Sequence, residues 1–313
     1  QKYGADMIRL WAGSADYHVD VRCSDKIFKQ LSQNYLKFRN TARYCLGNLD
    51  GFDPDHLVSP EEMLELDRWA VTKLNELIRK CFAAYDNYEF HVVSHAINDF
   101  CVVELSSFYL DIIKDRLYCE GVDSLERRSA QTALYTILDG MTRLIAPILA
   151  FTSDEIWAAM RHDRSADTES VLLNDMPGYD EALALSEADQ VRWDKLISVR
   201  DAVNKALENA RAAGVFKKAQ DTEVTLSVAE QKDADFLSGV DLATLCIVSR
   251  VTVTTGAVEG EKMADCLIPC TIVVKLSEAP KCVRCWNHNE HVGEDHDHPE
   301  LCPRCAGVVR AEA

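Results

Sequence analysis

The chain is 313 residues long, which exceeds one ordinary domain and predicts two or three folded units. Apolar residues make up 47% of it and charged residues 27%, the balance of a globular protein, so wholesale disorder is excluded. The 34 Lys and Arg residues are outnumbered by 51 Asp and Glu residues, and the formal net charge is −17. This charge excludes a protein that coats nucleic acid uniformly, so a polyanionic partner would have to bind at local basic patches.

Four of the twelve cysteines form two C-x-x-C pairs near the C-terminus, and the other eight are scattered among apolar neighbours. Scattered thiols are typical of a reducing compartment, whereas a secreted disulfide scaffold is small and dense in cysteine. The chain opens without a secretion signal and contains no run of about 18 apolar residues. We therefore expect a cytoplasmic protein without a membrane partner. Because the chain begins at Gln1, without an initiator methionine, we expect it to be a piece of a longer protein.

Helical periodicity begins after residue 24. Residues 1–24 show no repeating pattern, and we interpret them as the tail of a preceding domain. From Ser24 to Cys45 apolar residues recur at three- and four-residue spacing, which predicts a helix. A second helix is expected to start at Ser59, which with Glu62 three residues later gives the pattern of a capping box.

Three more amphipathic stretches complete a predicted bundle. The third helix is expected over about 90–118 as one continuous element, with Val103 among its inward residues. A fourth helix follows Ser124, and a fifth opens at Thr152. Isolated helices of this length are marginal in water. Their apolar stripes therefore predict an antiparallel helix bundle over 25–180.

The periodicity changes beyond the bundle. A long helix is expected over about 186–213, closed by Gly214. Alternating or continuous β-branched residues predict three strands, at 224–228, 251–253 and 272–274. The stretch VEGEKMAD lies between the last two strands and suggests that they form a hairpin. A short helical piece is expected around Phe236, and residues 181–278 are expected to contain the long helix followed by a small α/β domain.

The sharpest pattern is a pair of C-x-x-C motifs separated by sixteen residues. Its members are Cys282, Cys285, Cys302 and Cys305. This spacing lets two tight turns present four sulfurs to one tetrahedral ion, and a stretch of about 35 residues needs such a metal to fold. We predict one structural Zn2+ in a finger over 279–313, with no position left open for catalysis. Alternatively, the thiols are idle or form disulfides. A histidine could also replace one cysteine, the candidates being His288, His291, His296 and His298.

Basic residues cluster over 22–43 and over 190–220, with six basic residues against one acidic and seven against three. On the first predicted helix, Arg39 and Arg43 lie one turn apart with Asn40 beside them. Such a face could bind a phosphate backbone. The alternative is an ordinary solvated helix face.

The predicted finger carries polar and aromatic residues of its own. Arg284 and Trp286 flank the ligand Cys285. An aromatic ring held rigidly beside a metal turn and flanked by arginine could stack on an unpaired base. The alternative is that Trp286 packs beneath the zinc turn as its small core.

Catalytic motifs are missing from these 313 residues. The sequence has no glycine-rich phosphate loop, no G-x-S-x-G and no H-E-x-x-H. His91 and His95 share a predicted helix face, but no third metal ligand is evident. We therefore predict neither an active site nor a catalytic residue here. The predicted fold class is mainly α: a helix bundle, a small α/β unit and a C-terminal four-cysteine finger.

Several stretches resemble the C-terminal part of the bacterial isoleucyl-tRNA synthetases, which are class I aminoacyl-tRNA synthetases. The stretches KYGADMIRLW, DYHVDVRCSDKI and YLKFRNTARYCLGNL resemble the segment that leads from the catalytic domain into the anticodon-binding helices. AFTSDEIW resembles a late helix of that bundle, and KCVRCW and LCPRC resemble the terminal zinc finger. The helical part is shared with the valine and leucine enzymes, whereas the finger points to isoleucine.

The resemblance implies a ligase that activates isoleucine with ATP and transfers it to tRNA, using HIGH and KMSKS motifs in a nucleotide-binding domain and a separate editing domain. Neither motif occurs in this chain. We therefore expect it to bind the tRNA for isoleucine at the anticodon stem and loop, as a monomer and without binding DNA. The candidate tRNA-binding residues are Lys37, Arg39, Asn40, Arg43, Lys217, Lys218, Arg284 and Trp286.

Two other functional classes fit parts of the pattern. A helical scaffold whose zinc finger recruits protein would expose a contiguous apolar patch and ignore RNA. A DNA-processing module with a glycosylase-like finger needs a nucleophilic N-terminus and a lesion pocket, neither of which the sequence shows.

Overall fold

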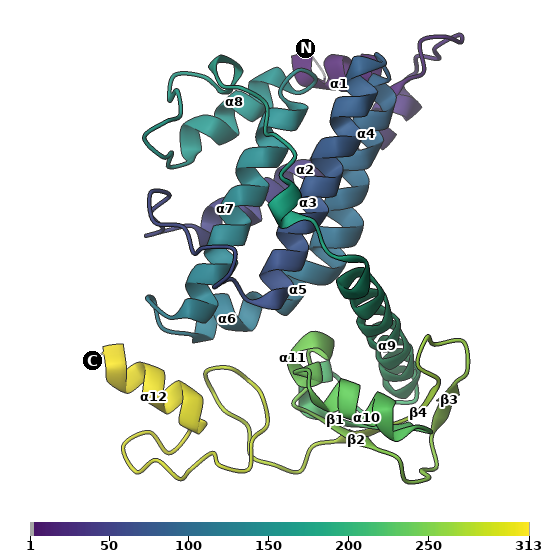
Figure 1. Ribbon diagram of the computed structural model, residues 1–313, viewed down its shortest axis with the longest axis vertical. Helices are drawn as coiled ribbons and strands as arrows, with labels where there is room; N and C mark the ends of the chain where they lie inside the picture. Colours follow the sequence, from purple (N-terminus) through teal and green to yellow (C-terminus); the bar gives the residue numbers. More distant parts are fainter. Residues whose placement is uncertain (1–2, 313) are drawn as a thin grey trace. The chain divides into compact units, whose positions relative to one another are not determined.

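The structure, a computed structural model, describes residues 3–312, which form two compact units (Figure 1). Unit 1 contains residues 3–117 and Val122–Ala184. Unit 2 contains Tyr118–Gly121 and residues 185–312. Over the residues described, no helix has both the length and the apolar character needed to cross a membrane.

Unit 1 is a helix bundle, as predicted. Its elements are α1 (Ala5–Ser14), α2 (Asp25–Asn48), α3 (Glu65–Asp86), α4 (Phe90–Asp99), the π-helix η1 (Phe100–Tyr109), α5 (Leu110–Ile112), α6 (Lys114–Cys119, whose last two residues belong to unit 2), α7 (Leu125–Ile145), α8 (Ala150–Ala159), and the 3-10 turns η2 (Val171–Leu173) and η3 (Glu181–Leu183). Helix α3 packs against α4 and α7, and Figure 1 shows the three side by side. The core between the helices includes the fully buried side chains of Trp69, Leu105, Leu134, Ile137 and Met141.

Two predicted helix starts in unit 1 are confirmed by their caps. The Ser24 side chain accepts a hydrogen bond from the Ile27 N–H, and the Ser124 side chain accepts one from the Arg127 N–H. The predicted start at Ser59 is wrong, because α3 begins six residues later. Ser59 and Glu62 do pair, at 3.3 Å, but they close a turn that precedes the helix.

The predicted start of the fifth helix at Thr152 is also wrong, because α8 begins at Ala150. Its first turn is capped by a distant residue. The Asp6 carboxylate accepts hydrogen bonds from the backbone N–H groups of Phe151 (3.3 Å) and Thr152 (2.7 Å). Residues 1–24, which show no periodicity, thus contain a helix that packs within unit 1 and supplies a cap there.

The third predicted helix is not a single α-helix. The stretch runs through α4, η1, α5 and α6, and the π-helix changes which side chains face inward. Because hydrogen bonds in a π-helix span five residues instead of four, the apolar stripe shifts around the axis. Val103, expected inward, is 56% exposed, whereas Cys101 and Leu105 are fully buried.

Unit 2 contains a long helix, a small sheet and the C-terminal segment. Its elements are α9 (Glu187–Ala212), η4 (Ala219–Asp221), β1 (Thr222–Val228), α10 (Gln231–Ser238), α11 (Leu242–Cys246), β2 (Arg250–Thr254), β3 (Glu261–Met263), β4 (Cys270–Leu276) and α12 (Pro303–Glu312). The long helix starts and ends as predicted, with Ser186 as its N-cap and Gly214 at a φ of 79° after its end.

The sheet has the strand order β2-β1-β4-β3, which corrects the predicted hairpin. β1 lies between β2 and β4, pairing parallel with β2 and antiparallel with β4. Its inward residues Val224, Leu226 and Val228 are buried, so the strand with the most buried residues takes one of the two interior positions. The VEGEKMAD stretch contains β3, the antiparallel neighbour of β4.

Candidate metal centre and nucleic-acid interface

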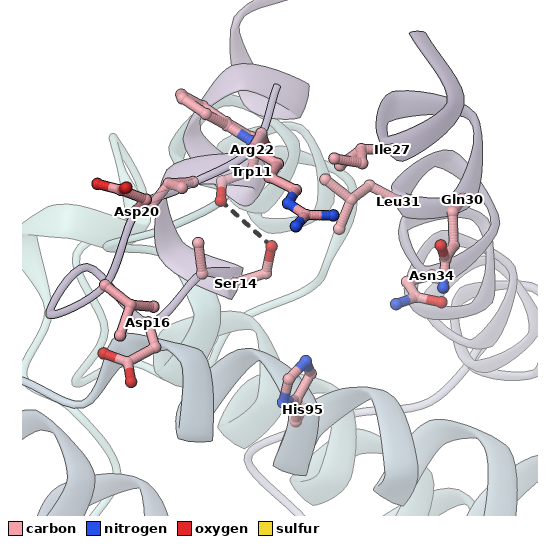
Figure 2. Close-up of a pocket in the computed structure, with 13 residues that line it drawn as sticks. Trp11, Ser14, Asp16, Asp20, Arg22, Ile27, Gln30, Leu31, Asn34 and His95 are labelled. Atoms are coloured by element: carbon pink, nitrogen blue, oxygen red, sulfur yellow. Dashed lines mark hydrogen bonds between the residues drawn. The ribbon is translucent and has the colours of Figure 1, made fainter. Parts of the chain in front are cut away.

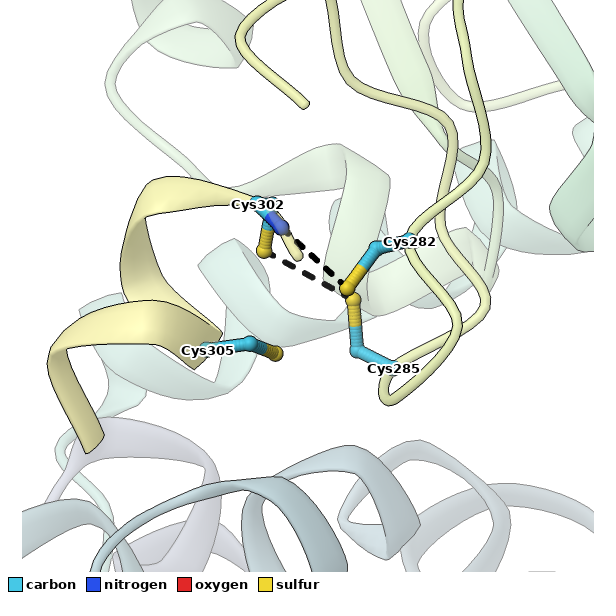
Figure 3. A group of neighbouring side chains, drawn as sticks. All are labelled: Cys282, Cys285, Cys302 and Cys305. Carbon is cyan, nitrogen blue, oxygen red and sulfur yellow. Dashed lines mark hydrogen bonds between the residues drawn. The ribbon is translucent and has the colours of Figure 1, made fainter. Parts of the chain in front are cut away.

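The four predicted zinc ligands lie together in unit 2 (Figure 3). Cys282 and Cys285 come from a loop, Cys302 directly precedes α12, and Cys305 lies in the first turn of that helix. All four are buried, and their Sγ atoms lie within 4.8 Å of one another. The Sγ atoms of Cys285 and Cys302 are 3.9 Å apart, close to the separation of about 3.8 Å that a tetrahedral zinc–thiolate site requires.

Backbone hydrogen bonds shape the two turns. The Trp286 N–H donates to the Cys282 carbonyl at 2.9 Å, and Trp286 takes a left-handed φ of 66°. The Ala306 N–H donates to the Cys302 carbonyl at 3.0 Å. The Cys302 N–H donates to the Cys282 Sγ at 3.3 Å, a contact that stabilises a thiolate and orients it toward a metal.

The protonation of the cluster also suits a cation. A hydrogen bond from Cys285 lowers the pKa of the Cys305 thiol, with further contributions from Cys302, Cys282 and Arg284. The same contact raises the pKa of Cys285, because the two sulfurs share one proton. A cluster that already favours one thiolate, with four soft donors within 4.8 Å of one another, fits Zn2+.

The two alternatives to a four-cysteine metal site, a disulfide and a histidine ligand, do not match the observed distances. The 3.9 Å between the sulfurs of Cys285 and Cys302 is nearly twice the length of a disulfide bond. Among residues 3–312, no group other than the four cysteines is placed to hold a metal. His288 instead faces the Ala279 carbonyl and the Asp221 carboxylate, at 2.6 and 3.3 Å.

A fifth cysteine, which the sequence pattern does not identify, packs against the four-cysteine cluster. Cys119 is buried in one cluster with the four ligand cysteines. The Arg284 guanidinium donates to the Cys119 carbonyl, and Arg304 pairs with Glu120 at 3.0 Å. Residues 118–121 are thus tied to both C-x-x-C turns. No signal in the sequence connects segments more than 160 residues apart.

The finger also carries an exposed aromatic ring beside a cation. The indole of Trp286 is 54% exposed, so it does not form a core beneath the zinc turn. The Lys218 ammonium lies 4.9 Å from the centre of the indole ring, and Lys217 beside it is exposed. One basic residue and one aromatic ring of the predicted set, Lys218 and Trp286, therefore come together within unit 2.

The other predicted residues lie on α2 in unit 1, and Lys37, Arg39, Asn40 and Arg43 are all exposed. Arg39, Asn40 and Arg43 line a hollow of about 330 Å³ whose opposite side is formed by residues of α8, including Glu155. Within the described part of the chain, neither arginine forms an ion pair. Their guanidinium groups are therefore open to an anionic ligand.

A second hollow, of about 320 Å³, lies near the first half of α2 (Figure 2). It is lined by residues of the segment 11–22, by residues of α2 and by His95 of α4. Trp11 donates from Nε1 to the Arg22 carbonyl at 3.1 Å, and this hydrogen bond joins the two ends of the segment 11–22. None of the predicted tRNA-binding residues lines this hollow.

Comparison with known proteins gives the class to which these features belong. Residues 67–226, about half of the chain, match the family described as the anticodon-binding domain of tRNA ligase, and the chain belongs to this family. Residues 280–307 match a zinc finger found in FPG and IleRS.

Individual relatives indicate which tRNA ligases this chain resembles. The chain is 45% identical to the isoleucine–tRNA ligase of Syntrophotalea carbinolica, over 99% of the chain and 33% of the relative. It is 42% identical to that of Caldanaerobacter subterraneus, over 100% of the chain and 34% of the relative. The resemblance to isoleucyl-tRNA synthetases is confirmed, and the chain spans about a third of the length of these relatives.

Proposed function

We propose that this chain is the RNA-binding region of an isoleucine–tRNA ligase and binds the anticodon stem and loop of the tRNA for isoleucine. In this proposal the ATP-dependent attachment of isoleucine takes place in parts outside these 313 residues, which contain neither HIGH nor KMSKS. The chain would act as a monomer in the cytoplasm. The match to the anticodon-binding family supports the assignment of the partner.

The observation that carries the proposal is the pair of unpaired guanidinium groups at the hollow on α2. Arginine binds phosphate through two parallel hydrogen bonds, and its charge is not lost at any physiological pH. The body of the chain is strongly acidic, so an RNA backbone gains energy only where basic residues gather. Glu155 lines the same hollow and would repel a phosphate that approached from α8.

The finger would provide a stacking contact. An exposed indole can stack on an unpaired base, and such contacts contribute about 1–3 kcal/mol per base. Lys218 beside the ring, with Lys217 and the partly exposed Arg284, would attract the neighbouring phosphates. Readout of single-stranded loops by aromatic rings is the common mode of RNA recognition.

The metal would serve the fold of the finger. One Zn2+, held by Cys282, Cys285, Cys302 and Cys305, would supply much of the folding free energy of a segment too short for a core of its own. These residues leave no ligand position for a substrate. The metal therefore fixes the turn that presents Trp286.

Charge reversal on α2 tests the first contact. We expect Arg39→Glu with Arg43→Glu to weaken tRNA binding at least about tenfold and to reduce the salt dependence by about two phosphate contacts. The matched control is Lys26→Glu with Lys29→Glu, which makes the same charge change on exposed positions of α2 outside the hollow. Equal losses in both variants, or none in either, would contradict the role of the hollow.

Substitution of the indole tests the second contact. We expect Trp286→Ala to weaken tRNA binding by about 1–3 kcal/mol, whereas Trp286→Phe keeps a stacking ring and most of the affinity. The rival function, a helical scaffold that recruits protein, predicts no binding of tRNA at any salt concentration. Filter binding with circular dichroism as a folding control distinguishes these outcomes.

A further inference from the structure

Four residues at the end of α6 and directly after it belong to the compact unit of the finger. Residues 118–121 are part of unit 2, whereas Leu117 before them and Val122 after them are part of unit 1. Tyr118 is 58% exposed, but the neighbouring Cys119 is only 6% exposed. Cys119 is buried because it packs into the cluster of the four predicted metal ligands.

Each C-x-x-C motif holds this segment through the arginine between its two cysteines. In the first motif the Arg284 guanidinium donates to the Cys119 carbonyl, and the Cys119 thiol donates back to the Arg284 carbonyl at 3.8 Å. In the second motif Arg304 pairs with Glu120 at 3.0 Å, and the Glu120 side chain is only 14% exposed. Two successive residues of the segment are thus bound by the two motifs.

The last residue of the segment lies beside α12. A Cβ added to Gly121 would be 3.8 Å from a carboxylate oxygen of Glu312 and 4.0 Å from Val308. These two residues are one turn apart on the helix that also carries Cys305. The segment therefore contacts the first motif, the second motif and the helix that positions the last ligand.

We propose that residues 118–121 are a clamp on the metal centre, which slows the loss of Zn2+ and is itself held in place by the metal. This inference rests on the proposed zinc site. A bound ion would fix both C-x-x-C turns and with them the positions of Arg284 and Arg304. The clamp in turn holds these turns and packs against the sulfurs, so a chelator reaches the ligands more easily once the clamp has opened. Such coupling between two binding events is reciprocal.

The clamp would extend the effect of the metal beyond the finger, because the same residues connect α6 to α7. Loss of the metal would loosen this connection. The hydrogen bonds of Arg116 with the buried carboxylate of Asp67 would still hold α6 in the bundle. We therefore expect a local opening at residues 118–121 when zinc is removed, while the bundle keeps its helicity.

Transfer of zinc to a metallochromic chelator tests the clamp from the side of the metal. The zinc content of the unsubstituted 313-residue chain is measured first, and one equivalent is expected. We expect Cys119→Ala with Glu120→Ala to transfer its zinc at least about tenfold faster, because both substitutions remove groups that support the ligand turns. The matched control is Cys246→Ala with Glu230→Ala, which removes a buried thiol and an ion-paired carboxylate of unit 2 outside the finger. It should transfer zinc at the unsubstituted rate.

Alkylation of the unsubstituted chain tests the clamp from the side of the thiol. Arg116 and Arg127 bracket a tryptic peptide whose only cysteine is Cys119. The buried Cys246 is likewise the only cysteine of its own tryptic peptide, residues 233–250. We expect Cys119 to be alkylated at least about fivefold faster after zinc has been removed. Cys246 should stay protected with and without zinc.

Failure of the clamp can be told apart from failure of the zinc site. If the chain holds zinc but the Cys119→Ala, Glu120→Ala variant releases it at the unsubstituted rate, the clamp is refuted and the zinc site stands. Equal alkylation of Cys119 with and without zinc has the same meaning. Equally fast release from the control variant also refutes the clamp, because any loss of packing in unit 2 would then suffice. A chain that holds no zinc refutes both the zinc site and the clamp.

Discussion

The buried carboxylate of Asp67 makes the sharpest stability prediction for unit 1. Asp67 is 0% exposed and accepts hydrogen bonds from both terminal nitrogens of Arg116, at 2.7 and 2.8 Å. The hydroxyl groups of Tyr109 and Ser129 donate to it at 2.7 and 2.6 Å. One carboxylate thus joins α3 to η1, α6 and α7.

Asp67→Ala would remove this acceptor and leave the buried guanidinium of Arg116 without a counter-charge. Breaking a buried ion pair from one side costs about 3–5 kcal/mol. A typical domain is stable by only about 5–15 kcal/mol, so the loss should be a large fraction of the total. We therefore expect the urea midpoint of the bundle to fall. Far-UV circular dichroism, which reports helix content, measures this midpoint.

Two comparisons make the result decisive. Asp111→Ala breaks an exposed ion pair with Lys114 and should cost no more than about 1 kcal/mol. Asp67→Leu with Arg116→Met removes both charges and should be less destabilising than Asp67→Ala alone. If Asp67→Ala costs no more than Asp111→Ala, the reasoning about the buried pair is refuted.

Three further predictions concern the metal, pH and a helix cap. Cys302→Ser should lower bound zinc from one equivalent per chain and unfold the finger while the bundle keeps its helicity; retention of zinc would contradict the four-thiolate site. A hydrogen bond from Lys281 lowers the pKa of Asp221, so its stabilisation of the finger is present above the carboxyl's unfolded pKa and is lost as pH falls through the folded one. Because the chain has five tryptophans, the step is measured as the difference between acid titrations of tryptophan fluorescence for the unsubstituted chain and for Asp221→Asn, which should lack it. Asp6→Ala should destabilise the bundle by about 0.5–2 kcal/mol in a thermal melt, because α8 loses its cap; an unchanged melting temperature would refute this.

Features that depend on neighbours in the sequence could be predicted from it. Ser24, Ser124 and Ser186 each accept a hydrogen bond from a backbone N–H three residues later, so these helix starts depend only on nearby residues. The four predicted metal ligands are recognisable for the same reason, because two residues between thiols define a turn. The structure brings these four together as predicted.

Features that depend on distant partners could not be predicted. The start of α8 is set by Asp6, and the contact of Cys119 with the metal centre joins remote segments. The exposure of Val103 follows from a π-helix, which keeps the residue composition of an α-helix but shifts its faces. The sheet order could not be derived either, because alternation marks a strand without naming its neighbour.

The hollow on α2 could be predicted from the sequence only in part. Periodicity and charge place Arg39 and Arg43 on one exposed face, but the far side of the hollow comes from α8. Glu155 therefore enters the candidate surface only through the fold. Its carboxylate would repel a phosphate on the α8 side, so a phosphate would be bound on the α2 side of the hollow.

The most direct test of the account is to measure which part of tRNA the chain binds. An isolated anticodon stem-loop and an acceptor-stem minihelix of the tRNA for isoleucine can be compared by filter binding at two salt concentrations. The account predicts that the stem-loop binds and that Arg39→Glu with Arg43→Glu weakens it. Binding of the acceptor minihelix alone, or of neither RNA at low salt, would contradict it.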